Sequence, residues 1–241
     1  FSKSSLKNLL KFGLPYQANS VLAVIKYDGL TSYLGTVLGT AGMGFVGWAQ
    51  RWANAPLRFF MDQVIKVTFP AYSRMQNDKT VLERSLNLSI FFISFLVFPA
   101  LVLLFLMSQP LTQIIPKYEK WQPAILILQL FAINTAWAAI STPVTNMFNA
   151  IGKISLTFKF IIIWTVLSVI TIKIIAKIYG VNGCGIGIAI VCTSSIVVLI
   201  AATKIVKINY FNSVIKPLLG CAVLFVFVKI ALSFMTLNFL S

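Results

Sequence analysis

The chain has 241 residues, of which 59% are hydrophobic and only 10% are charged, and its formal net charge is +15. Soluble domains carry about 25% charged residues. This chain therefore has too little polar surface to be covered in water, and several apolar stretches exceed the roughly 18 residues that indicate a membrane span. The composition excludes an ordinary soluble domain and predicts an all-α, polytopic bundle of transmembrane helices.

Seven spans are expected, with about 20 apolar residues needed for each. Their apolar runs are continuous rather than alternating, which favours helices over a barrel. Glycine-containing segments at 40–44 and 179–183 separate two pairs of neighbouring spans. The expected spans are 13–38, 44–70, 85–107, 121–150, 157–178, 184–203 and 217–239.

The predicted organisation has three parts. Residues 1–12 form an amphipathic cytoplasmic lead-in, residues 13–205 a six-helix lobe, and residues 206–241 an additional transmembrane helix that ends before a returning one. Orientation follows from lysine and arginine in alternate loops, which are enriched on the cytoplasmic side. One side carries eleven such residues and the other four, so residue 1 is expected in the cytoplasm.

The histidine and cysteine content of the chain limits the metal sites and catalytic groups that it can form. The chain has no histidine, the commonest general base and metal ligand. Cys184, Cys192 and Cys221 are spaced neither as a disulfide framework nor as a zinc site. We therefore expect no metal, no cofactor and no catalytic residue. The basic residues lie between apolar runs and form no stripe interleaved with aromatics, so nucleic acid is not expected as a partner.

The second predicted span carries a stripe of charged and polar residues. At about 100° per residue, Arg51, Asn54, Arg58, Asp62 and Lys66 occupy one arc of about 120°. Each charge costs at least about 2.5–3.5 kcal/mol in mid-membrane, so the stripe should face protein or a water-filled cavity. Asp62 is placed to bridge Arg58 and Lys66 at a spacing of four, or to act in ion coupling. Three cations against one carboxylate still leave a positive lining suited to an anionic substrate.

Two other spans add polar groups. In the first, Tyr16, Asn19, Lys26 and Tyr33 share one arc of about 100°, while Asp28 lies nearly opposite and is interpreted as a structural ion-pair partner or a coupling acid. The fourth span is rich in uncharged polar residues, which either line a cavity or simply pack membrane helices. These are Gln129, Asn134, Thr135, Ser141, Thr142, Thr145, Asn146 and Asn149.

An ordered set of motifs gives the chain a family resemblance. It resembles the polysaccharide transporter branch of the multidrug/oligosaccharidyl-lipid/polysaccharide exporter superfamily, which includes O-antigen flippases, and specifically the second half of such a protein. One departure concerns Asp28, which lies about two residues before the position where relatives commonly carry an acid. The motifs are LLKFGLP at 9–15, YLGTVLGTAGMGFVGWAQRW at 33–52, VTFPAYSRMQND at 67–78, FP at 98–99, KW at 120–121, NAIGK at 149–153 and GVNGCGIGIAI at 180–190.

The resemblance implies two lobes around a central cavity that opens alternately to each side of a bacterial inner membrane. It implies an undecaprenyl-pyrophosphate-linked oligosaccharide as substrate, membrane lipids as surroundings, and an N-terminal lobe of the same chain as partner. Arg51, Arg58 and Lys66 would then bind pyrophosphate with help from Lys26, while Asn54, Tyr16 and Asn19 would bind sugar.

Three alternatives remain. A purely structural membrane subunit predicts that neutralising Arg51 and Arg58 leaves surface polysaccharide unchanged. A multidrug exporter of the same superfamily would need an acidic cavity. A membrane-embedded glycosyltransferase or polymerase would need clustered carboxylates, whereas Asp78, Glu83 and Glu119 are well separated.

Overall fold

The computed structural model describes the backbone of residues 3–239 and the side chains of residues 13, 17–18, 21–22, 24 and 27–230. Throughout residues 3–239 the structure is helical and contains no strand, which confirms the predicted all-α class. The elements are α1 (Lys3–Arg74), α2 (Lys79–Ile114), the 3₁₀-helix η1 (Glu119–Ala124), α3 (Ile125–Ala150), α4 (Ile154–Thr193), α5 (Ile196–Thr203), the π-helix η2 (Phe211–Ile215) and α6 (Lys216–Phe239).

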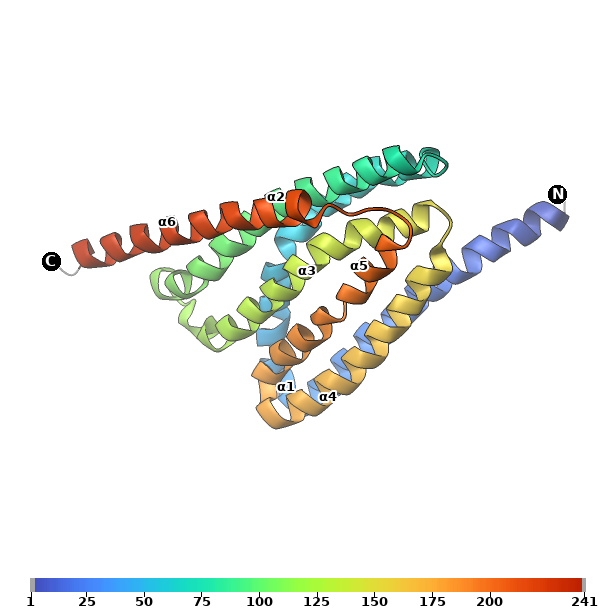
Figure 1. Cartoon of the computed structure of the whole chain (residues 1–241). Coiled ribbons are helices and arrows are strands. Elements are labelled where there is room, and N and C mark those ends of the chain that lie inside the picture. Colours follow the sequence, from blue (N-terminus) through green and yellow to red (C-terminus); the bar gives the residue numbers. More distant parts are fainter. Residues whose placement is uncertain (1–2, 240–241) are drawn as a thin grey trace.

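Two of the long helices are each broken at one glycine. Gly39 in α1 has φ 67° and ψ 179°, and Gly180 in α4 has φ 58° and ψ −133°. Residues with a side chain rarely adopt such positive φ values, whereas glycine does so readily. Both helices reverse direction at these points, and the two reversals lie at the same end of the bundle (Figure 1). Gly180 lies inside the predicted break at 179–183, and Gly39 lies one residue before the predicted break at 40–44.

By length and apolar composition, four helices within the described residues can cross a membrane. They are Lys79–Ile114, Glu119–Ala150, Ile154–Thr203 and Phe211–Ile230. The predicted number of seven spans is not confirmed. The third of these helices has 50 residues and contains the reversal at Gly180; a straight helix of that length would measure about 75 Å, against a hydrocarbon core of about 30 Å. The chain is therefore a multi-pass membrane protein.

Glycines hold the two arms of α4 close together. A Cβ atom at Gly183 would lie 2.7 Å from the Cα of Ala176, and one at Gly187 would lie 3.1 Å from the Cα of Ile172. The two glycines are four residues apart, on one face of the returning arm. Small residues at this spacing allow membrane helices to approach each other closely, so the glycine-rich segment after Gly180 is the packing surface of a tight helical hairpin.

Positively charged turns gather at one end of the bundle. The α1–α2 turn, the α3–α4 turn and the α5–α6 connection lie at that end, while the reversals at Gly39 and Gly180 and the η1 segment lie at the other (Figure 1). The predicted orientation depends on this arrangement, in which basic residues are concentrated in every second loop. We refer to the end that holds the α1–α2 turn, the α3–α4 turn and the α5–α6 connection as the lysine-rich end. Its basic residues include Arg74, Lys79, Arg84, Lys153, Lys204, Lys207 and Lys216.

A hydrogen-bonded clamp fixes the α5–α6 connection to α2. The side-chain amide of Asn87 donates to the Lys207 carbonyl at 3.0 Å, and its oxygen accepts from the Asn209 backbone N–H at 2.7 Å. The same oxygen accepts from the Ser213 hydroxyl at 3.2 Å, and the Glu83 carboxylate accepts from the Lys207 N–H at 2.8 Å. These bonds set the position at which α6 begins beside α2.

The hairpin packing predicts that Gly183→Ala destabilises the protein, because the new methyl group would meet the backbone of the facing arm. Overpacking of this kind costs about 1–3 kcal/mol. Gly220→Ala is the matched control, since a Cβ at that helical position meets nothing within 4 Å. Thermal unfolding in detergent measures the difference, and equal melting temperatures for the two variants would contradict the packing.

The clamp predicts that Asn87→Ala exposes the α5–α6 connection to protease. Backbone groups of Lys207 and Asn209 would lose their partner, and an unsatisfied group of this kind costs about 1–3 kcal/mol where water is excluded. Limited trypsin digestion should then cleave after Lys207 faster than in the wild type. Asn182→Ala, which alters an exposed asparagine beside the Gly180 reversal, should leave the cleavage rate unchanged.

Candidate functional site

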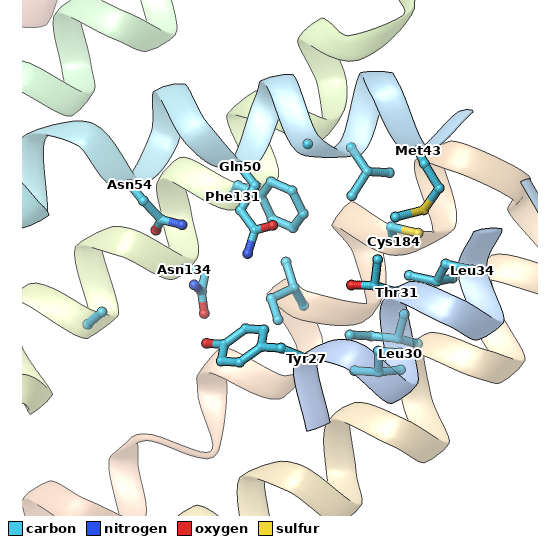
Figure 2. A pocket seen from close by; sticks show the side chains of 15 residues that line it. Tyr27, Leu30, Thr31, Leu34, Met43, Gln50, Asn54, Phe131, Asn134 and Cys184 are labelled. Atoms are coloured by element: carbon cyan, nitrogen blue, oxygen red, sulfur yellow. The ribbon is translucent and has the colours of Figure 1, made fainter. Parts of the chain in front are cut away.

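A cavity of about 430 Å³ lies between the two arms of α1, α3 and both arms of α4. Pockets of about 300–1,000 Å³ are typical of small-molecule sites. Its polar lining comes from Tyr27, Thr31, Gln50, Asn54 and Asn134. Figure 2 shows that the Tyr27 hydroxyl and the Gln50 and Asn134 amides point into the same space. The reversal at Gly39 makes this possible, because it brings Tyr27 and Gln50 from opposite arms of one helix to one cavity.

A second cavity of about 230 Å³ adjoins the first and shares Tyr27, Asn134, Ala138 and Ile188 with it. It extends along α3 and α4 and is lined mainly by hydroxyl groups. The Ser168 hydroxyl is buried and has no hydrogen-bond partner among the described residues. Besides Tyr27, the hydroxyl-bearing residues are Ser141, Thr142, Thr145, Ser168 and Ser195.

Among the described residues, those that line the two cavities are all uncharged. Amides both donate and accept hydrogen bonds, and so do hydroxyls. A lining of this kind matches a neutral, polyhydroxylated ligand and offers nothing to neutralise a charged one. Two uses were open for the polar residues of the predicted fourth span, lining a cavity or packing helices together. Asn134, Ser141, Thr142 and Thr145 line a cavity. Thr135 and Asn146 instead bond α3 to α1.

Hydrogen bonds between α1 and α3 position the cavity wall. The Thr135 hydroxyl donates to the Asn54 side-chain oxygen at 3.1 Å, and the Asn146 amide donates to the Thr68 hydroxyl at 3.1 Å. Asn54 is therefore held by α3 while it lines the cavity. This fixes the rotation of the second α1 arm about its own axis, and with it the direction of the charged stripe on that arm.

Around the second arm of α1, the charged stripe lies next to the face that lines the cavity. Asn54 belongs to both, whereas Arg51, Arg58, Asp62 and Lys66 are exposed on the surface of α1 and line neither cavity. The stripe is thus an open surface of this chain. Charges of this kind require water or protein rather than lipid at membrane depth.

The ion pairs that the spacing permits between Asp62 and its neighbours Arg58 and Lys66 are not formed in the structure. Asp62 forms no ion pair with Arg58 or Lys66; within the described part of the chain, the ion pair observed is Lys79–Glu83, with 4.0 Å between Nζ and Oε1. The Lys66 ammonium donates instead to the Gln63 side-chain oxygen at 3.4 Å. A spacing of four permits such a bridge, but exposed pairs gain little from it. Asp28 is likewise exposed and forms no ion pair with a described residue.

Of the polar face predicted for the first span, the structure describes one side chain, that of Tyr33. The side chains of Tyr16, Asn19 and Lys26 lie outside the described residues. Tyr33 packs against α4, where the Lys173 ammonium lies 4.8 Å from the centre of its ring. Tyr33 is about 120° from Tyr27 around the helix, so it does not reach the cavity.

Three cavity residues were not among the sequence candidates: Tyr27, Thr31 and Gln50. Tyr27 and Thr31 are four residues apart on one helical face, which is a detectable signal. The predicted arc of Tyr16, Asn19, Lys26 and Tyr33 lies beside this face of the helix. Gln50 immediately precedes the first arginine of the stripe and lies on the side of the arm that turns inward.

Comparisons with known proteins agree on one family. A family model described as polysaccharide biosynthesis protein matches residues 1–126. The chain is 26% identical over 220 residues to "Lipopolysaccharide biosynthesis protein WzxC" of Escherichia coli (strain K12), an alignment that covers 91% of this chain and 42% of the relative. It is 27% identical over 155 residues to "Uncharacterized membrane protein in cps region" of Klebsiella pneumoniae, covering 64% of this chain and 32% of that protein. No solved structure matches significantly.

The chain therefore spans less than half the length of the curated relatives that it matches. The matches confirm the resemblance to polysaccharide transporters drawn from the ordered motifs. With half of its length matched by the family model, the chain belongs to the polysaccharide biosynthesis protein family.

Proposed function

We propose that the full-length protein moves a lipid-linked oligosaccharide across the bacterial inner membrane by alternating access, and that it is a transporter rather than an enzyme. The observation that carries this proposal is the position of Asn54 on the second arm of α1. It joins an uncharged, hydroxyl- and amide-lined cavity to a surface bearing three unpaired cations. A glycan attached to a pyrophosphate has the same two chemical parts side by side.

The cationic part of the site suits pyrophosphate. Arg51 and Arg58 carry planar guanidinium groups that can donate two parallel hydrogen bonds to one phosphate group, and Lys66 adds a third positive charge. The described residues supply these groups with no carboxylate partner within 4.0 Å. Lys26, on the first α1 arm, is proposed to assist them, and Tyr16 and Asn19 are proposed to contact sugar.

The neutral part of the site suits the glycan. Gln50, Asn54 and Asn134 offer amide donors and acceptors, and the second cavity adds hydroxyls. The polyprenyl tail would remain in the bilayer while the head group crosses between lobes. Such alternating access requires a second lobe, which the rest of the full-length chain would supply, with residue 1 of this segment on the cytoplasmic side. Asp28 and Asp62 remain the proposed coupling acids. An exporter of organic cations would need an acidic cavity, and no described residue that lines these cavities is acidic.

Arg51→Gln combined with Arg58→Gln in the full-length protein should reduce surface polysaccharide at least tenfold and cause lipid-linked oligosaccharide to accumulate on the cytoplasmic side. A hydrogen bond to a charged group contributes about 1.5–3 kcal/mol, so the loss of two arginines exceeds a factor of ten. Immunodetection of the glycan and extraction of the lipid intermediate measure the two effects.

The matched control for this pair is Lys153→Gln with Lys159→Gln, which removes two exposed cations from another helix. Comparable expression of all variants must be verified in membranes. Normal polysaccharide in the arginine variant would exclude the stripe as the pyrophosphate site.

Gln50→Leu should slow transport of the glycan-bearing lipid about tenfold and leave transport of the sugar-free carrier pyrophosphate unchanged. The reason is that leucine keeps the volume but removes an amide that bonds sugar, and each such bond contributes about 0.5–1.5 kcal/mol. Transport in vesicles containing the reconstituted full-length protein provides the measurement. Gln113→Leu, an exposed glutamine of α2 outside both cavities, serves as control. Equal slowing of both lipids would contradict a sugar-binding role for the cavity.

A further inference from the structure

A separate groove of about 380 Å³ lies toward the lysine-rich end, between the first turns of α2, η2 and the start of α6, which runs alongside α2 (Figure 1). It shares no residue with the two cavities of the candidate site. Its lining consists of Arg84, Asn87, Leu88 and Phe91 from α2, Asn212 and Ser213 from η2, and Lys216 from α6.

The mouth of this groove is positively charged. Arg84 and Lys216 are both exposed, and neither forms an ion pair with a described residue. Glu83, which precedes Arg84, is already engaged, because its carboxylate accepts from the Lys207 N–H and lies 4.0 Å from the Lys79 ammonium. The groove therefore has two uncompensated cations at its entrance, with the Asn212 amide as an additional donor.

The apolar part of the groove lining comes from α2, and an exposed apolar stretch of α6 follows Lys216. Along α2, Leu88 and Phe91 line it, and Phe91 stacks on Phe95 with ring centres 5.8 Å apart. On α6, Leu219 and Val223 lie three and seven residues after Lys216, which places them on the same helical face; both are exposed. A ligand that fits these features has an anionic head and an apolar chain that continues along the helices.

The width of the groove is fixed by the clamp. Asn87 bonds the Lys207 carbonyl, the Asn209 N–H and the Ser213 hydroxyl, so α2 is joined to the α5–α6 connection and to η2, which leads directly into α6. Arg84 and Lys216 therefore project from helices of set spacing rather than from a free loop. A ligand then has only the two side chains to order, and not the backbone that carries them.

We propose that this groove binds an anionic phospholipid of the surrounding bilayer, with its phosphate on Arg84 and Lys216 and one acyl chain along Leu88, Phe91 and Val223. Basic pockets between membrane helices bind anionic lipid head groups in this way. A soluble phosphate would use the two cations but would leave the apolar walls uncovered, so the bilayer lipid is the ligand that satisfies both. The proposal does not depend on the transported substrate.

The test uses the full-length protein in nanodiscs of phosphatidylcholine titrated with phosphatidylglycerol, with retained lipid counted by native mass spectrometry. Each cation near the surface contributes about a fivefold gain in affinity for an anionic lipid. Arg84→Gln combined with Lys216→Gln should therefore weaken phosphatidylglycerol retention about 30-fold. The wild type should retain phosphatidylglycerol in preference to phosphatidylcholine.

Two controls separate a defined site from general attraction. Lys153→Gln with Lys159→Gln removes two exposed cations from another helix outside the groove, and it should retain phosphatidylglycerol as the wild type does. Thermal unfolding in pure phosphatidylcholine should be the same for all three proteins, which shows that the groove variant folds. Equal loss in both double variants, or no loss in the groove variant, would overturn the proposal. Displacement of the lipid by millimolar glycerol phosphate would also overturn it, because the ligand would then be a soluble phosphate.

Discussion

Reversal of a helix at a single glycine is the constraint on which this architecture depends. At Gly39 and Gly180 the backbone adopts positive φ, and each long helix folds back against its neighbours. The return of α4 buries Gly183 and Gly187 against the first arm, while Gly185 would place a Cβ 3.2 Å from the Cα of Ile127 on α3. The cavity exists because arms that run in opposite directions meet α3 from different sides. A straight continuation at either glycine would separate Tyr27 from Gln50 or Ile172 from Cys184, all of which line that cavity.

Charge and hydrogen-bonding capacity are divided between two surfaces of the second α1 arm. Its inward side presents Gln50 and Asn54 to an uncharged cavity, and its outward side presents the arginines and Lys66. The Asn54–Thr135 hydrogen bond holds the arm in this rotation. Under the proposed function this separation is useful, because sugar hydroxyls would not compete with phosphate for the same donors.

The sequence predicted the helical class, the glycine-containing breaks and the gathering of basic turns at one end, because each follows from local chemistry. Continuous apolar runs require helices, and positive φ requires glycine at the reversals. The sequence also marked the polar residues of α3, although it left open whether they packed or lined a cavity.

The rotation of the first span was not predictable from a helical wheel. The wheel shows which residues share a face but not which face meets the cavity, and that depends on packing against α3 and α4. Lys173 on α4 draws Tyr33 toward it, and Tyr27 faces inward instead. The state of Asp62 was equally undetermined, because a spacing of four permits a salt bridge on an exposed surface without making it favourable. Some of the predicted side chains, including that of Lys26, lie outside the described residues, and their roles stay predictions.

The length of α2 has a consequence for the bilayer around it. Its 36 residues would extend about 54 Å as an unbroken helix, whereas the hydrocarbon core is about 30 Å thick. Such an excess requires tilt, protrusion into the head-group layer or bending, and proline inside a helix, as at Pro99 and Pro110, favours bending. Hydrophobic mismatch of this kind costs fractions of a kcal/mol per ångström. The resting tilt of the bundle should accordingly change with acyl-chain length, so that membrane thickness becomes a physical variable acting on the protein alongside its ligands.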